Sequence, residues 1–188
     1  MKVLRNVDDL VAELEKCLTQ GHVVISVDGT DGSGKTRLAT ALSSTLGAEN
    51  IELDRLLERN KGGFLDYLDY GELQQKIRNA SVSSRRTVVE GVCVQKVLNK
   101  INVKPDVRVY VKRLIGSDWT DGKPFEQNKT ADQIIAEEED KLNLFRGLQG
   151  SAGSSVSGGI PGVTKEVIRY HCEYGPHKAA DYIFEFVE

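Results

Sequence analysis

A glycine-rich stretch near the start of the chain has the residue types and spacing of a polyphosphate-binding loop. Residues 29–36 match the pattern G-x-x-x-x-G-K-[ST] at every fixed position. Glycines let successive backbone N–H groups turn toward phosphate oxygens, and a helix that starts there adds the positive end of its dipole. Lys35 can bring its charge to the β- and γ-phosphates, and the Thr36 hydroxyl can ligate Mg²⁺. The predicted phosphate site comprises Gly29, Thr30, Asp31, Gly32, Ser33, Gly34, Lys35 and Thr36.

The residues on both sides of this loop supply the structural context that phosphate binding requires. Residues 22–28 form an apolar, β-branched run that is typical of a strand buried on both faces. Leu38, Leu42 and Leu46 then lie on one stripe of a helix, which Gly47 ends. The alternative is a glycine-rich turn without a ligand, and the strand, loop and helix in sequence argue against it.

The rest of the chain repeats this alternation of strands and helices. Hydrophobic periodicity and capping residues predict further strands over 50–54, 87–90, 107–111 and 182–186, and helices over 6–18, 69–80, 130–145 and 163–174, with a short helix ending near 101. Five strands alternating with helices predict an α/β fold of the P-loop type. In it, a five-stranded parallel sheet is sandwiched by helices within a single domain, residues 1–188.

One segment departs from this pattern. Residues 147–162 contain six glycines and four serines, a composition that favours a flexible surface loop. The alternative is a flap that covers a bound substrate.

Two other classes of P-loop protein do not fit the sequence. A GTPase should carry a guanine-reading N-K-x-D motif, but residues 99–102 and 128–131 both begin Asn-Lys and lack the aspartate. Residues 157–159 resemble part of the transporter-ATPase signature, yet a chain of 188 residues is too short for that class. A small kinase remains.

Four segments then resemble the uridine kinase-like P-loop kinases. These are VDGTDGSGKT at the first strand and loop, ELD at the end of the second strand, VVEG at the end of the third and VYVKR on the fourth. The resemblance covers most of residues 22–113. It implies a five-stranded parallel sheet, ATP with Mg²⁺ as cofactors, and transfer of the γ-phosphate to a hydroxyl, often that of a nucleoside.

Two carboxylates at strand ends become candidates for the chemistry. Asp54 falls where the family places the acidic residue that faces the acceptor hydroxyl, and a carboxylate at the end of a strand next to the loop lies beside the ligand crevice. There it can orient the hydroxyl and take its proton. The alternative for Asp54 is an N-cap of the turn at 55–57. Glu90 matches the acidic end of the family's third strand, where it would hold Mg²⁺ through water.

The acceptor pocket and the lid are predicted from the same resemblance. Residues 63–70 resemble the family's acceptor-contacting segment, so Tyr67 or Tyr70 could stack on a base and Asp69 could hold sugar hydroxyls. Asp69 also reads as an N-cap. Extra positive charge over the γ-phosphate usually comes from lid arginines, whose pattern is missing here. Arg113 is the first candidate and Arg146 the second, while the acidic run 137–140 most simply indicates a solvated helix face.

Composition limits the remaining classes. The net charge is −3, so no basic field favours a nucleic-acid partner. No apolar run is long enough to span a membrane, and the N-terminus lacks a secretory h-region, so we expect a cytoplasmic protein with no membrane partner. The three cysteines are widely spaced, which argues against a disulfide framework or a zinc site. A lone His171 predicts a packed or surface histidine rather than a catalyst.

The sequence supports a phosphotransferase with a small, nucleoside-like acceptor, and two alternatives stay open. The acceptor could instead be a nucleotide, a sugar phosphate or a vitamin precursor. The protein could instead be a non-catalytic ATP-binding regulator, since the lid arginines are missing. Acceptor identity and oligomeric state are not determined by the sequence.

Overall fold

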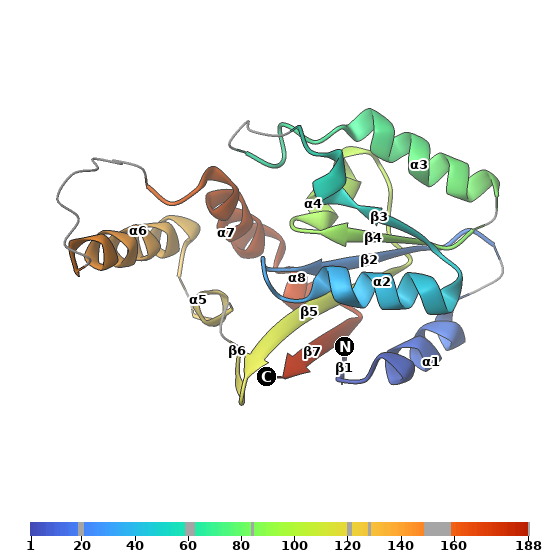
Figure 1. Ribbon diagram of the computed structural model, residues 1–188, viewed down its shortest axis with the longest axis horizontal. Coiled ribbons are helices and arrows are strands. Elements are labelled where there is room, and N and C mark those ends of the chain that lie inside the picture. Colours follow the sequence, from blue (N-terminus) through green and yellow to red (C-terminus); the bar gives the residue numbers. More distant parts are fainter. Residues whose placement is uncertain are drawn as a thin grey trace.

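The computed structural model describes residues 1–18, 21–58, 63–83, 85–119, 122–127, 129–148 and 159–187, and it is built around one twisted sheet (Figure 1). The sheet order is β1-β7-β5-β2-β4-β3, with β6 paired to β5 outside this path. All pairs along the path are parallel, and only β5 and β6 are antiparallel. The strands are β1 (Lys2–Leu4), β2 (Val24–Gly29), β3 (Glu49–Glu52), β4 (Thr87–Gly91), β5 (Val107–Ile115), β6 (Asp118–Trp119) and β7 (Tyr182–Val187).

The predicted α/β class and parallel sheet are confirmed, but the strand count is corrected from five to seven. The two extra strands, β1 and β6, have only three and two residues, too few to show a hydrophobic period. The second predicted strand ends at Glu52, and Asp54 lies in the 3₁₀ helix η1 (Leu53–Leu56). The fourth runs on to Ile115, so Arg113 lies within β5 rather than at its end.

Helices cover both faces of the sheet. One face is covered by α1 (Val7–Cys17) and α2 (Lys35–Leu46), whose leucines pack in one core cluster with β2, β5 and β7. The other face carries α3 (Tyr70–Val82), α4 (Val94–Lys100) and α7 (Gly162–Tyr174), which share a second cluster with β2, β3 and β4. The remaining helices are α5 (Lys123–Glu126), α6 (Ala131–Leu148) and α8 (Pro176–Ala179).

Capping residues fix the helix starts where the sequence places them. The Asn6 side chain accepts from the backbone N–H two residues on, and Asp69 accepts from the N–H three residues on. Thr130 and Gln133 form a reciprocal capping box at the start of α6, with contacts of 2.9 and 3.3 Å. Gly175 ends α7 in a left-handed conformation at φ +52°. These local signals work because each satisfies an otherwise unpaired backbone group.

Helices α5, α6 and α7 form a lobe beside the carboxyl ends of the strands (Figure 1). Ile134 and Ile135 of α6 pack against Ile168 of α7 in a small cluster of their own. The predicted flexible segment falls partly on α6 and α7, and residues 149–158 lie outside the described residues, so its flexibility stays a prediction. Among the described helices, none is both long and apolar enough to span a membrane.

A buried aromatic and histidine cluster packs between β5 and this lobe. His171 is buried, as expected of a packed histidine. Its Nδ1 lies 2.8 Å from the carbonyl of Val167, which can only accept, so Nδ1 carries the proton in the neutral ring. Its Nε2 then accepts from the Tyr110 hydroxyl at 2.7 Å. Burial lowers the pKa of both His171 and the neighbouring His177 to about 4, so both rings are neutral at pH 7.

Candidate active site

The predicted phosphate loop connects β2 to α2 at the carboxyl edge of the sheet. Gly34 caps α2 with φ +93° and Gly32 has φ +71°, both left-handed conformations that favour glycine. Lys35 begins the helix and is only 5% exposed. Its Nζ donates to the Thr30 carbonyl at 3.2 Å, so the ammonium group lies folded back over its own loop. The loop backbone therefore curves around a central space, the cradle, and the Lys35 ammonium group lies across it.

Two hydroxyl groups of this loop lack hydrogen-bond partners among the residues that the structure describes. Thr30 Oγ1 and Ser33 Oγ are both buried and make no hydrogen bond there. Buried hydroxyls without partners are costly unless a ligand or water satisfies them. Gly29 is required on packing grounds, because a Cβ there would lie 2.6 Å from Ser33 Oγ and 3.0 Å from the Val111 carbonyl oxygen. Hydroxyls, backbone N–H groups and Lys35 together fit a polyphosphate.

Side chains from β5 and β7 pack against the outer side of the loop. A Cβ on Gly34 would lie 2.7 Å from two carbons of the Phe186 ring. The Arg113 guanidinium reaches the same region, since one of its terminal nitrogens is 3.8 Å from the Cβ position of Gly32. Residues 113 and 186 are in register on neighbouring parallel strands, which explains why both reach the loop. Of the two predicted lid arginines, Arg113 lies beside the phosphate loop, whereas Arg146 lies exposed in the last turn of α6.

The two predicted metal ligands lie together although they are 54 residues apart. Thr36 Oγ1 donates to Glu90 Oε1 at 3.0 Å. Glu90 is opposite Val27 in the pairing of β2 with β4, which brings it beside the start of α2. Glu90 is 3% exposed, and burial raises the pKa of its carboxyl despite the hydrogen bond from Thr36 and the charge of Lys35. A hydroxyl and a carboxylate are the oxygen donors that Mg²⁺ prefers, so this pair fits the ion.

A cavity of about 980 Å³ opens directly onto the phosphate loop. Thr30 and Asp31 of the loop and Asp54 of η1 contribute to its lining. Asp54 reaches this position because η1 follows β3 immediately at the carboxyl edge of the sheet. The apolar part of the wall includes Phe64 near η1 and Val167 of α7. A carboxylate, a phosphate loop and an apolar surface thus share one space of ligand size.

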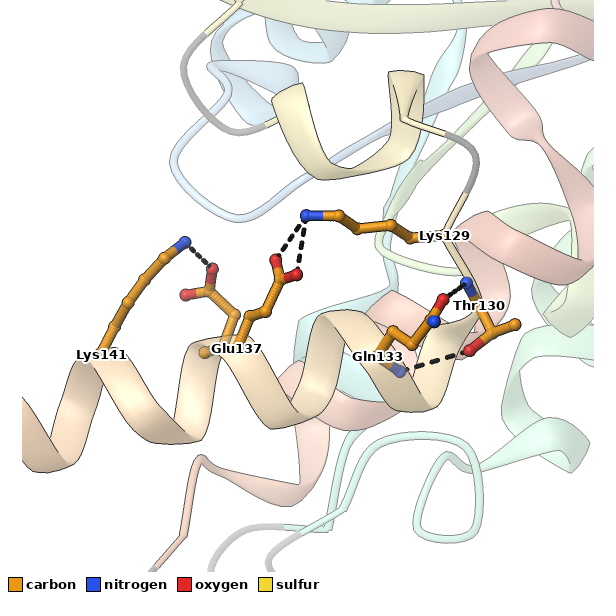
Figure 2. A network of polar contacts seen from close by, with 6 residues as sticks. Lys129, Thr130, Gln133, Glu137 and Lys141 are labelled. Atoms are coloured by element: carbon orange, nitrogen blue, oxygen red, sulfur yellow. Dashed lines mark hydrogen bonds and ion pairs between the residues drawn. The ribbon is translucent and has the colours of Figure 1, made fainter.

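Ion pairs on and before α6 line another part of this cavity. Figure 2 shows Lys129 paired with Glu137 above this helix. Lys129 Nζ lies 2.7 Å from Glu137, and Lys141 Nζ lies 2.6 Å from Glu138 Oε1. All four residues line the cavity. The acidic run 137–140 is predicted to be a solvated face, and the Glu137 and Glu138 side chains are 45% and 35% exposed, so both remain in contact with solvent while they pair with lysines. The i,i+3 spacing of Glu138 and Lys141 is the one sequence signal that could have indicated a paired helix face.

Three residues predicted to bind the acceptor lie elsewhere. Asp69 caps α3 through the hydrogen bond already described. The Tyr70 hydroxyl donates to the Leu65 carbonyl at 2.7 Å, and the Lys100 ammonium lies 4.0 Å from the centre of its ring. Neither of these residues nor Tyr67 belongs to the cavity lining. Contact between these three side chains and an acceptor therefore stays a prediction, and the cavity beside the loop is lined by other residues.

Comparison with known proteins is informative at the level of the fold. Neither the protein-family models nor the curated proteins include a match to this chain. A solved structure described as "Possible Uridine Kinase" from Bacillus stearothermophilus is similar, with a TM-score of 0.55 and 19% identity over 95% of this chain and 96% of that one. A kinase assigned to a fructose transport system of Silicibacter sp. TM1040 aligns with a TM-score of 0.47 and 15% identity, over 96% and 100% of the two chains. The chain has the fold of the P-loop kinases, as the resemblance of its motifs implied.

Proposed function

We propose that the protein is a kinase that binds ATP with Mg²⁺ at residues 29–36 and transfers the γ-phosphate to a hydroxyl of a small, nucleoside-like acceptor. The observation that supports this most is the position of Asp54, whose side chain shares one cavity with the phosphate loop. A phosphate site alone would serve any P-loop protein. A carboxylate across an acceptor-sized space from that site is what transfer to a hydroxyl requires.

The phosphate end of the proposed site is formed by residues at the start of α2. The backbone N–H groups of the loop and the Lys35 ammonium would hold the phosphates, and Lys35 would exchange its contact with the Thr30 carbonyl for them. Thr36 and Glu90 would hold the metal, Thr36 by direct ligation and Glu90 through water. Bound Mg²⁺ supplies charge neutralisation at the β- and γ-oxygens. Arg113, beside Gly32, is the residue best placed to add positive charge.

At the acceptor end, the proposed role of Asp54 is to orient the hydroxyl and accept its proton during transfer. An apolar or planar acceptor body would lie on the wall that Phe64 and Val167 form, and its polar groups would face the ion pairs of Lys129 and Lys141. Such a mixed wall suits a polar, uncharged molecule such as a nucleoside. A phosphorylated acceptor would have to displace one of these glutamates from its lysine.

The proposal is tested by ADP formation from Mg·ATP, measured with no acceptor, with pooled nucleosides, and with pooled sugar phosphates and nucleotides. The Lys35→Ala variant is the control, and its folding is checked by thermal unfolding because Lys35 is buried. We expect the nucleoside pool to stimulate turnover in the wild type, and we expect no stimulation in the variant. ATP binding without stimulation by any pool would favour the regulator instead, and absence of ATP binding would refute both.

A further inference from the structure

A buried hydrogen-bonded pair connects the phosphate loop to the helix that forms the acceptor wall. Asp28 lies at the end of β2, directly before the loop, and is 3% exposed. Its Oδ1 accepts from the backbone N–H of Gly29 at 2.8 Å, and its Oδ2 accepts from the Tyr170 hydroxyl of α7. Tyr170 is fully buried, and its oxygen also accepts from the Gln95 N–H at 3.3 Å. The same carboxylate therefore contacts the first residue of the loop and α7.

Helix α7 forms much of the apolar side of the cavity on which the acceptor is proposed to lie, and we call this side the acceptor wall. Val163, Val167 and Ile168 of this helix line the cavity. Glu166 of the same helix accepts from the backbone N–H groups of Phe64 and Leu65, at 3.1 and 2.9 Å. A shift of α7 would therefore move both its own side chains and the segment that carries Phe64. The contact with Asp28 fixes this helix relative to the sheet at one buried point.

Gly29 connects the loop to the Asp28 carboxylate. Its N–H donates to Asp28 Oδ1 at 2.8 Å, while Oδ2 accepts from Tyr170. Burial raises the pKa of the Asp28 carboxyl to about 7, and the hydrogen bonds from Tyr170 and Gly29 lower it, so each bond favours the ionised form. A polyphosphate that holds the loop in one conformation would hold the Gly29 N–H against Asp28, and the ionised carboxylate is the better acceptor for Tyr170. Occupancy of the phosphate loop should in this way tighten the contact that holds α7.

We propose that Asp28 is a positioning residue that couples nucleotide binding at the phosphate loop to the ordering of α7 and the acceptor wall through Tyr170. This inference rests on the proposed function only in requiring that the loop binds a nucleotide. The coupling is reciprocal, so an acceptor that orders α7 would also strengthen nucleotide binding by the same factor. Asp28 and Tyr170 touch neither phosphate nor acceptor in this scheme and act by placing the groups that do.

The test is hydrogen exchange of residues 162–174, with and without Mg²⁺ and a non-hydrolysable ATP analogue. It compares the wild type with Tyr170→Phe, which removes the hydroxyl and keeps the ring. The matched control is Tyr174→Phe, one turn further along α7 and outside the contact with Asp28. We expect the analogue to slow α7 exchange at least threefold in the wild type and in Tyr174→Phe. In Tyr170→Phe we expect analogue affinity within about twofold of wild type and no added protection.

Steady-state kinetics give a second readout that a merely structural role would not move. We expect Tyr170→Phe to raise the acceptor KM at least threefold while the KM for ATP stays within about twofold. Asp28→Asn should also weaken nucleotide binding. The asparagine amide has one oxygen that accepts and one NH₂ group that only donates, so it cannot accept from both Gly29 and Tyr170 as the carboxylate does.

Equal α7 protection in wild type and Tyr170→Phe would overturn the coupling while leaving the kinase proposal intact. Protection that depends on Tyr170, without any acceptor-stimulated turnover, would support the coupling and refute the kinase. A wild type that does not bind the analogue would overturn both.

Discussion

Gly34 offers a direct test of how the phosphate loop is shaped, because substitution by alanine should act in two separable ways. The backbone conformation at φ +93° costs an alanine about 1–2 kcal/mol. The added Cβ would lie 2.7 Å from the Phe186 ring, well inside normal contact, and overpacking of this kind costs about 1–3 kcal/mol. We therefore expect Gly34→Ala to lose about 2–5 kcal/mol of unfolding free energy and nearly all affinity for Mg·ATP.

Gly47 is a matched control at the other end of the same helix. It has φ +62° and nothing within 4 Å of its Cβ position, so Gly47→Ala reports the backbone cost alone. The clash is isolated by a double-mutant cycle with Phe186→Leu, which should recover about 1–2 kcal/mol in the Gly34→Ala background. Urea unfolding measures the free energies, and calorimetric titration measures Mg·ATP affinity. Gly34→Ala no less stable than Gly47→Ala, or zero coupling to Phe186, would refute this account of the loop.

Three further predictions concern charged and titrating groups. Glu90→Gln keeps an oxygen that can accept the hydrogen bond from Thr36 and removes a buried charge, so stability at pH 7 should hold or rise. Mg²⁺-dependent turnover should fall about 10²–10³-fold, and turnover equal to that of the wild type would exclude Glu90 from the metal site. His177 has no hydrogen-bond partner among the described residues, and its pKa of about 4 lies below the unfolded value, so stability is lost as pH falls from 6.5 to 4. His177→Leu should reduce that loss by about 1.4 kcal/mol per pH unit in urea titrations, and an unchanged slope would contradict the burial argument. Lys129→Met should cost less than about 1 kcal/mol of stability yet shift the acceptor KM several-fold, because Lys129 and its partner Glu137 line the cavity. Lys165→Met should leave the acceptor KM unchanged, because its pair with Glu139 lies outside the cavity lining. Equal effects of the two variants on KM would count against an acceptor contact with the Lys129 ion pair.

Local chemistry explains which features could be predicted from the sequence. The phosphate loop and the caps at Asn6, Asp69 and Thr130 depend on residues within a few positions of one another, and the structure places them as expected. The pairing of Thr36 with Glu90 could also be anticipated, since strands on both sides of β2 end at the same edge of the sheet.

The cavity lining beyond the loop could not be predicted, because it depends on contacts between distant segments. The Glu137 side chain on α6 is 45% exposed, yet it lines the same cavity as Thr30 and Asp31 of the loop. Asp28 and Tyr170 are 142 residues apart, and no motif connects the two positions. The segment 63–70 predicts that Tyr67 or Tyr70 could stack on a base, but it does not indicate that the Tyr70 hydroxyl donates to the Leu65 carbonyl of the same segment. Position along the chain indicates which residues are near the site, but not which way they face.

If a hydroxyl acceptor meets the terminal phosphate in the cavity shared by the loop and Asp54, as we propose, replacing Asp54 by asparagine should stop transfer without preventing ATP binding. Acceptor-stimulated turnover and Mg·ATP affinity are measured on the same preparation, with Asp9→Asn as a control for an exposed aspartate on α1, outside the cavity lining. We expect a fall in turnover of about 10²–10⁴-fold with ATP affinity within about twofold of wild type, and no change in the control. Turnover of Asp54→Asn equal to that of the wild type would contradict this proposal.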